Sequence, residues 1–77
     1  MIDREGMTPL YLQVADLIAA RISSGELAPN RPVPSEHELA AAFGVARGTA
    51  RKALGVLKDR GLVVAVNGRG TFVRERP

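Results

Sequence analysis

Apolar residues recur at helical spacing early in the chain, where a single stripe is formed by Leu10, Val14, Leu17, Ile18 and Ile22. Thr8 and Pro9 precede the stripe and have the residue types of an N-cap and a first helical residue. Gly25 follows it and is typical of a position just past a helix end. The pattern predicts a first helix that starts at Pro9 and stops before Gly25.

The segment LAPNRPVP, residues 27–34, contains three prolines, which exclude a helix and favour an extended connector that can hold a short strand. Ser35 and Glu38 then show the S-x-x-E spacing of a capping box, which predicts a second helix that ends at Gly44. The expected buried face of this helix comprises Leu39, Ala42 and Phe43.

A third helix is predicted from Arg47 to Arg60, and only Val45 and Ala46 separate it from the second. Two helices joined by so tight a glycine turn indicate a helix-turn-helix. At 100° per residue, one arc of the third helix carries Ala50, Ala53, Leu54 and Leu57. The opposite arc carries Arg47, Gly48, Arg51, Lys52, Gly55 and Lys58. The two glycines weaken an exposed helix, so we expect a surface that approaches this arc closely.

The stretch LVVAVNGRGTFV, residues 62–73, departs from the helical period and has β-branched residues on both sides of Asn67 and Gly68. Asn-Gly between such runs predicts a β-hairpin with a type I′ turn, and Arg69 then lies beside its tip. Three helices and a C-terminal hairpin define an α+β, mainly α, winged helix-turn-helix. We place this domain at residues 9–74, between flexible termini at 1–8 and 75–77.

Composition limits the remaining possibilities. The 77 residues suit one small domain, and without cysteine neither a disulfide nor a thiolate zinc site stabilises it. We expect no metal and no cofactor. No signal peptide and no membrane-spanning run is evident, so a cytoplasmic location is expected and no membrane partner. The net charge is −3 over residues 1–44 and +6 over residues 45–77, as expected when one side of a domain faces a polyanion.

Arg47 and Arg51 lie four residues apart at the start of the third helix, on one side of it. A solvated helix face explains such a pair, but neither arginine has an acidic residue four positions away on the helix. We therefore expect both guanidinium groups to point outward, free of the domain's own acids. There they can bind guanine edges or phosphates, while Thr49 adds a hydroxyl and Lys52 and Lys58 add nonspecific attraction. Arg69 at the hairpin tip can enter a minor groove.

These residues resemble the N-terminal winged-helix domain of GntR-type bacterial transcription regulators. The resemblance covers about residues 9–73, with PSE, LA, FGV, R-x-T-x-R, AL, GL and G-x-GTF in the family's order and spacing. It implies dimers on palindromic operators, the third helix in the major groove and the wing at the minor groove. Family members normally add a C-terminal effector domain, so this chain without one is either an excised domain or a miniature regulator.

The resulting set of DNA-contact residues comprises Ser35, His37, Ala46, Arg47, Gly48, Thr49, Arg51, Lys52, Asn67, Gly68 and Arg69. Three of them depart from the family pattern. His37 stands where an arginine is frequent, which makes that contact weaker or pH-dependent. Ala46 replaces a frequent serine or threonine and removes an N-cap, and Gly48 replaces another hydroxyl residue.

The main hypothesis is therefore a regulator, most often a repressor, whose partner is double-stranded operator DNA and which binds as a possible homodimer. The alternative is a winged helix used as a protein-interaction or architectural module, since one fold hosts both roles. The basic C-terminal half favours DNA. An enzyme lacks support because no paired carboxylates, activated nucleophile or phosphate loop is evident.

Overall fold

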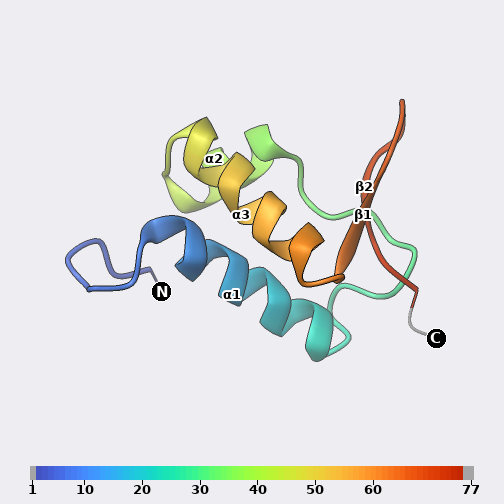
Figure 1. Cartoon of the computed structure of the whole chain (residues 1–77), viewed down its shortest axis with the longest axis horizontal. Coiled ribbons are helices and arrows are strands. Elements are labelled where there is room, and N and C mark those ends of the chain that lie inside the picture. Colours follow the sequence, from blue (N-terminus) through green and yellow to red (C-terminus); the bar gives the residue numbers. More distant parts are fainter. Residues whose placement is uncertain (1, 76–77) are drawn as a thin grey trace.

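The computed structural model of the chain describes residues 2–75, in which three helices are followed by a β-hairpin (Figure 1). The helices are α1 (Leu10–Ser23), α2 (Glu36–Phe43) and α3 (Arg47–Asp59), and the strands are β1 (Val63–Val66) and β2 (Gly70–Val73). The hairpin projects from one end of the helical layer (Figure 1). The predicted fold class is confirmed.

The first helix starts one residue later than the sequence predicted. Pro9 is the N-cap residue, with φ −54° and ψ 146°, and no side chain caps the helix. Because that ψ is extended, Pro9 is not the first helical residue and Thr8 is not the cap, so both assignments were wrong. The Thr8 carbonyl instead accepts a hydrogen bond from Gln13 Nε2 at 2.7 Å. Gly25 follows the helix with φ +87°, as expected.

The proline-rich connector lies alongside the hairpin. The Val33 N–H donates to the Thr71 carbonyl at 2.9 Å, and Pro32 forms an isolated antiparallel bridge with Phe72. The short strand expected here is thus reduced to a single bridge. Asn30, at φ +67°, takes the positive φ expected for this turn, and its N–H donates to the Val73 carbonyl at 2.9 Å. These bonds hold the connector against β2.

Both ends of α2 agree with the sequence prediction. The Ser35 hydroxyl accepts the Glu38 N–H at 3.1 Å, and the Glu38 carboxylate accepts the Ser35 N–H at 2.9 Å. Gly44 ends the helix in the left-handed region, at φ +64°. The expected burial of Ala42 was wrong: Ala42 is exposed, because the fold covers the other edge of the stripe, where Ala40 lies.

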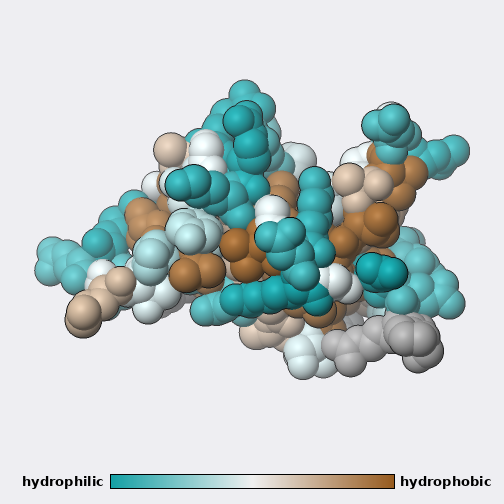
Figure 2. Space-filling model, viewed as in Figure 1, coloured by the Kyte–Doolittle hydropathy of each residue, from teal (hydrophilic) through white to brown (hydrophobic). Residues whose placement is uncertain are grey.

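The core lies between the helices and the base of the hairpin. All four residues that the helical wheel assigned to the inner arc of α3 are buried: Ala50, Ala53, Leu54 and Leu57. Val63 and Val73 pair directly across the hairpin and are also buried, which anchors the hairpin in the core. Val64 and Val66 remain exposed, and Figure 2 shows apolar surface on the hairpin below a hydrophilic tip.

The N-terminal segment contacts the turn between α2 and α3. Arg4 Nη2 donates to the carbonyls of Phe43 and Gly44, at 3.1 Å and 2.8 Å. These bonds satisfy acceptors at the end of α2. The flexibility expected for residues 1–8 and 75–77 stays a prediction, and residues 1, 76 and 77 lie outside the described part. Within residues 2–75, no helix combines the length and apolarity needed to cross a bilayer.

Candidate nucleic-acid interface

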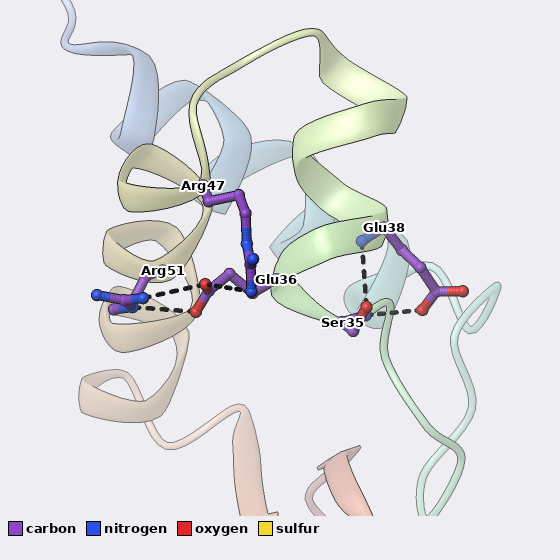
Figure 3. Close-up of polar contacts among 5 residues, drawn as sticks. All are labelled: Ser35, Glu36, Glu38, Arg47 and Arg51. Carbon is purple, nitrogen blue, oxygen red and sulfur yellow. Dashed lines mark hydrogen bonds and ion pairs between the residues drawn. The ribbon is translucent and has the colours of Figure 1, made fainter.

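Arg47 and Arg51 lie on the same side of α3, at its N-terminal end, as predicted (Figure 3). Their side chains are 66% and 72% exposed. Both approach one carboxylate, that of Glu36 in the first turn of α2. Arg51 Nε lies 3.0 Å from Glu36 Oε2 and Arg51 Nη2 lies 3.1 Å from Oε1, while Arg47 Nη2 lies 3.3 Å from Oε1.

The expectation that these guanidinium groups are free of the domain's own acids was therefore wrong. No acidic residue lies four positions from either arginine on α3, but Glu36 reaches both of them from the preceding helix. The ion pairs do not hide the arginines, which keep most of their surface in solvent. Since exposed ion pairs contribute little free energy, phosphate or guanine groups can compete with Glu36 for the same donors.

The electrostatics of this cluster follow from its hydrogen bonds. The pKa of Glu36 is lowered, first by the hydrogen bond from Arg51 and further by the charges of Arg51 and Arg47. The pKa of Arg51 is raised by the same hydrogen bond. Glu36 therefore stays ionised at neutral pH, and the cluster of one carboxylate and two arginines has a net charge of +1.

The backbone at the start of α3 is flanked by small residues, Ala46 and Gly48. Ala46 is the N-cap residue and provides no side-chain hydrogen bond. Gly48 is exposed, and a Cβ placed on it meets no atom within 4 Å. Thr49 is half-buried. A helix start of this kind leaves backbone N–H groups accessible to an anion.

Of the other residues predicted to contact DNA from the helix-turn-helix, His37 and Ser35 lie at the start of α2, whereas Lys52 faces α1. His37 is exposed in the first turn of α2, beside Glu36. Ser35 is exposed at the α2 N-cap, where its hydroxyl is already the acceptor of the capping box. Lys52 is not brought to the side of the arginine pair, since its Nζ lies 5.4 Å from the centroid of the Tyr11 ring on α1.

The hairpin closes differently from the predicted two-residue type I′ turn. Val66 pairs with Gly70, so the loop contains the three residues Asn67, Gly68 and Arg69, and the Arg69 N–H donates to the Val66 carbonyl at 3.0 Å. A type I′ turn requires positive φ at both central positions. Gly68 has φ +74°, but Asn67 does not adopt a positive φ, so the predicted turn type was wrong. All three predicted wing residues are nevertheless exposed at the tip.

A groove of about 530 Å³ separates α3 from the hairpin, and the sequence reasoning did not identify it. Its charged lining residues are Glu36, Glu38, Arg51, Lys58 and Arg69. Gly55 also lines it, between Arg51 and Lys58 on α3. The spacing i, i+4, i+7 of Arg51, Gly55 and Lys58 places them on one face of α3, which is the sequence feature that could have indicated this wall of the groove. Glu36 was not predicted as a site residue, although it is the last residue of the PSE motif and the first residue of α2.

Within residues 2–75, no three histidine, cysteine, aspartate or glutamate side chains lie close enough together to hold a metal ion. Figure 2 shows a hydrophilic hairpin tip and hydrophilic surface mixed with apolar patches around α3. The exposed residues of this region include Arg47, Arg51, Lys58 and Arg69. The arrangement is suited to binding an anion through charge and hydrogen bonds, not to covalent chemistry.

Comparison with known proteins matches residues 10–73 to the bacterial regulatory proteins of the gntR family. The transcriptional repressor NagR of Bacillus subtilis (strain 168) is 43% identical over 72 residues, which are 94% of this chain and 30% of NagR. YtrA from Sulfolobus acidocaldarius, a GntR-family transcription factor, has a TM-score of 0.90 and 42% identity, over 100% of this chain and 66% of that one. AraR(DBD) in complex with operator ORR3 has a TM-score of 0.82 and 44% identity, over 95% of this chain and 88% of that one.

Fold and site together define a winged helix-turn-helix domain of the DNA-binding class. Since the family match covers most of the chain, the protein belongs to the gntR family of bacterial regulatory proteins. The resemblance seen in the motifs is thereby confirmed, as is the prediction of a regulatory protein and not an enzyme. The chain spans about 30% of the length of the curated relatives it matches.

Proposed function

We propose that this domain binds a specific double-stranded DNA operator, with the N-terminal end of α3 in the major groove and the wing at the minor groove. The observation that supports it most directly is the pair Arg47 and Arg51, which are 66% and 72% exposed on one side of α3. The recognition helix of a helix-turn-helix contacts base edges with these N-terminal residues. Similarity to AraR(DBD), which is solved in complex with operators ORR3, ORX1 and ORE1, supports operator binding by this domain.

Base readout depends on the two guanidinium groups. Each presents parallel N–H donors that match O6 and N7 of guanine, and one such bidentate pair discriminates by about 1–3 kcal/mol. In the free protein Arg51 already makes a two-point contact of this kind with Glu36. The fork is thus held in an ordered position before DNA arrives, which lowers the entropy lost on binding.

The remaining proposed contacts serve positioning. The backbone N–H groups around Gly48 and the Thr49 hydroxyl contact phosphate, and His37 and Ser35 lie where α2 meets the DNA backbone. At the wing, Arg69 enters the minor groove, and Asn67 and Gly68 allow the tip to approach closely. Lys52 provides nonspecific attraction from the α1 side of α3.

We further propose that the regulator is a repressor that acts in the cytoplasm, as a homodimer on a palindromic operator. NagR, MngR and the arabinose metabolism regulator of Geobacillus stearothermophilus are named repressors. A two-fold arrangement doubles the contacts of a small domain, and the two half-sites then lie one helical turn or a multiple apart.

The decisive experiment is selection of bound duplexes from a random pool at moderate salt. The domain should enrich one sequence, arranged as an inverted repeat, and an Arg47→Ala, Arg51→Ala double variant should lose the enrichment. If the double variant enriches the same sequence equally, these arginines do not read DNA. If the unaltered domain enriches nothing, the alternative of a protein-interaction or architectural module is correct.

A further inference from the structure

The N-terminal arm, residues 2–8, is a loop that leads into α1 and is held at both of its ends (Figure 1). At the first end, Ile2 packs against the hydrophobic core. The Gln13 side chain of α1 accepts the Asp3 N–H, and its Nε2 donates to the Asp3 carbonyl at 2.8 Å and to the Thr8 carbonyl at 2.7 Å. One side chain of α1 therefore closes the arm into a fixed loop.

Arg4 extends from this loop to the turn between α2 and α3. Its Nη2 donates to the carbonyls of Phe43 and Gly44, and a Cβ placed on Gly44 would lie only 3.1 Å from the same nitrogen. Within residues 2–75, no backbone N–H donates to either carbonyl, and Arg4 takes part in no ion pair. The contacts of this guanidinium group are therefore with the turn, where a cation at the C-terminal end of a helix is also favourable.

The arm joins two parts of the domain that otherwise have little direct contact. Both α1 and α2 pack against α3, while their contact with each other is slight and includes the Arg21 guanidinium group, 5.9 Å from the centroid of the Phe43 ring. The recognition helix begins at Arg47, only three residues after Gly44, and its N-cap residue Ala46 forms no side-chain hydrogen bond. The start of α3 therefore depends for its position on the turn that precedes it.

We propose that Arg4 is a positioning residue for operator recognition, which fixes the α2–α3 turn to α1 and thereby aligns Arg47 and Arg51 with the base edges. The inference rests on the proposed function and adds to it a residue that acts through the turn and not by contact with DNA. Bidentate base readout requires an accurate direction of the donors, so it depends on the groups that support the recognition helix. Attraction to phosphates depends mainly on charge and tolerates a small shift of the helix.

The test measures the affinity of Arg4→Gln for the selected operator and for a nonspecific duplex of the same length, well below the midpoint of thermal unfolding. The ratio of operator to nonspecific affinity should fall several-fold. A direct phosphate contact by Arg4 would instead weaken both affinities alike and reduce the slope of log K against log salt by about 0.9. Arg31→Gln is the control, since it removes the same charge from an exposed residue of the connector and should keep the ratio.

A second variant tests whether the arm acts as a unit. Gln13→Leu removes the three hydrogen bonds that hold the arm to α1 without a change of charge. It should lower the same ratio, and the double variant with Arg4→Gln should lower it no further than the more severe single variant, because both changes release the same contact. Additive losses would show that the arm does not act through Arg4.

Amide hydrogen exchange examines the turn without DNA. The N–H groups of Gly44 and Val45 both donate to the Ala40 carbonyl, and they should exchange faster in Arg4→Gln, because the turn opens more readily once its restraint is lost. The proposal is overturned if exchange at the turn is unchanged, or if Arg4→Gln lowers the thermal midpoint but keeps the affinity ratio. Failure of the proposed function looks different, since the unaltered domain would then prefer no operator while the exchange result still decides whether Arg4 holds the turn.

Discussion

Arg51 and Glu36 form a two-point ion pair between α3 and α2, with N–O distances of 3.0 Å and 3.1 Å. Glu36 is the less exposed partner, at 22%, whereas Arg51 is 72% exposed. The carboxylate lies between the guanidinium groups of Arg51 and Arg47 (Figure 3), and both arginines keep most of their side-chain surface in solvent. The pair holds the guanidinium group of Arg51, which we propose reads a base, beside the start of α2. It also places a negative charge next to the proposed DNA-binding surface.

Replacement of Glu36 by glutamine should separate these two effects. Loss of the negative charge should raise the affinity for nonspecific duplexes and steepen its salt dependence, because two arginines are then free to bind phosphates. Discrimination between operator and nonspecific DNA should fall, because the guanidinium groups lose their fixed position. Binding titrations on both duplexes provide the measurement.

Glu26→Gln is the matched control for this variant, since Glu26 is also paired with an arginine, but with Arg21 of α1. It changes the net charge by the same amount and should keep the ratio of operator to nonspecific affinity. An unchanged ratio in Glu36→Gln as well would show that Glu36 does not position the arginines.

Arg47→Ala and Arg51→Ala should each cost about 1–3 kcal/mol of operator affinity. Both side chains are largely exposed, and their removal leaves the core untouched, so the midpoint of thermal unfolding should change little. Fluorescence anisotropy with an operator duplex and a thermal melt of the same sample measure the two quantities. A large fall in the melting midpoint would indicate that the ion pairs with Glu36 have a structural role instead.

Most of the fold was predictable because local signals and packing agree. The capping box at Ser35, the left-handed Gly44 and the inner arc of α3 each had a short-range cause that the tertiary structure did not oppose. The errors occurred where a residue's state depends on its neighbours. Ala42 lies at the edge of an apolar stripe, and only the position of the other helices determines which edge is covered.

The candidate site was predictable only in part, for the same reason. The spacing of Arg47 and Arg51 on one helix determines that they share a side, and the structure agrees. Their contact with Glu36 depends on how α2 packs against α3, which no spacing along either helix specifies. The groove likewise depends on the direction of the hairpin relative to α3, so the outward position of Gly55 and Lys58 on α3 was predictable but the facing wall was not.

Leu57→Ala should destabilise the domain more than any surface change. Leu57 is 0% exposed and belongs to the core, and truncation of such a leucine costs about 2–5 kcal/mol. In a domain of this size that is a large part of the total stability. Chemical denaturation followed by circular dichroism gives the value, and Val64→Ala on the exposed side of β1 is the control. A loss below 1 kcal/mol would contradict the assigned core.

The stability of the domain should fall at acidic pH. The pKa of Glu38 is lowered mainly by the hydrogen bond from the Ser35 backbone, and that of Glu36 mainly by the hydrogen bond from Arg51, both from an ordinary value of 4.5. A carboxyl group whose pKa is lower in the folded state stabilises fully above its unfolded pKa and loses this effect as the pH falls through the folded pKa. The loss should therefore begin near pH 4.5 and increase below it.

Thermal melts between neutral and acidic pH test this expectation. Glu38→Gln should be less stable at pH 7 and should lose less stability on acidification, since it lacks one of the two groups. Glu26→Gln keeps both hydrogen-bonded carboxylates and should follow the unaltered domain. Parallel pH profiles for all three proteins would show that the capping box does not contribute to acid sensitivity.

A serine at position 46 should stabilise the domain. Ala46 has φ −67° and ψ 153°, the extended backbone of an N-cap residue, but its methyl group cannot accept a hydrogen bond from the first turn of α3. In Ala46→Ser the hydroxyl can accept the N–H of Gly48 or Thr49, which is worth about 1 kcal/mol, or roughly 4–8 °C in the melting midpoint of a domain of this size. Ala41→Ser, at an exposed position inside α2, is the matched control and should lower the midpoint slightly, because serine is a weaker helix former than alanine. If both serine variants shift the midpoint alike, the start of α3 is not limited by its missing cap.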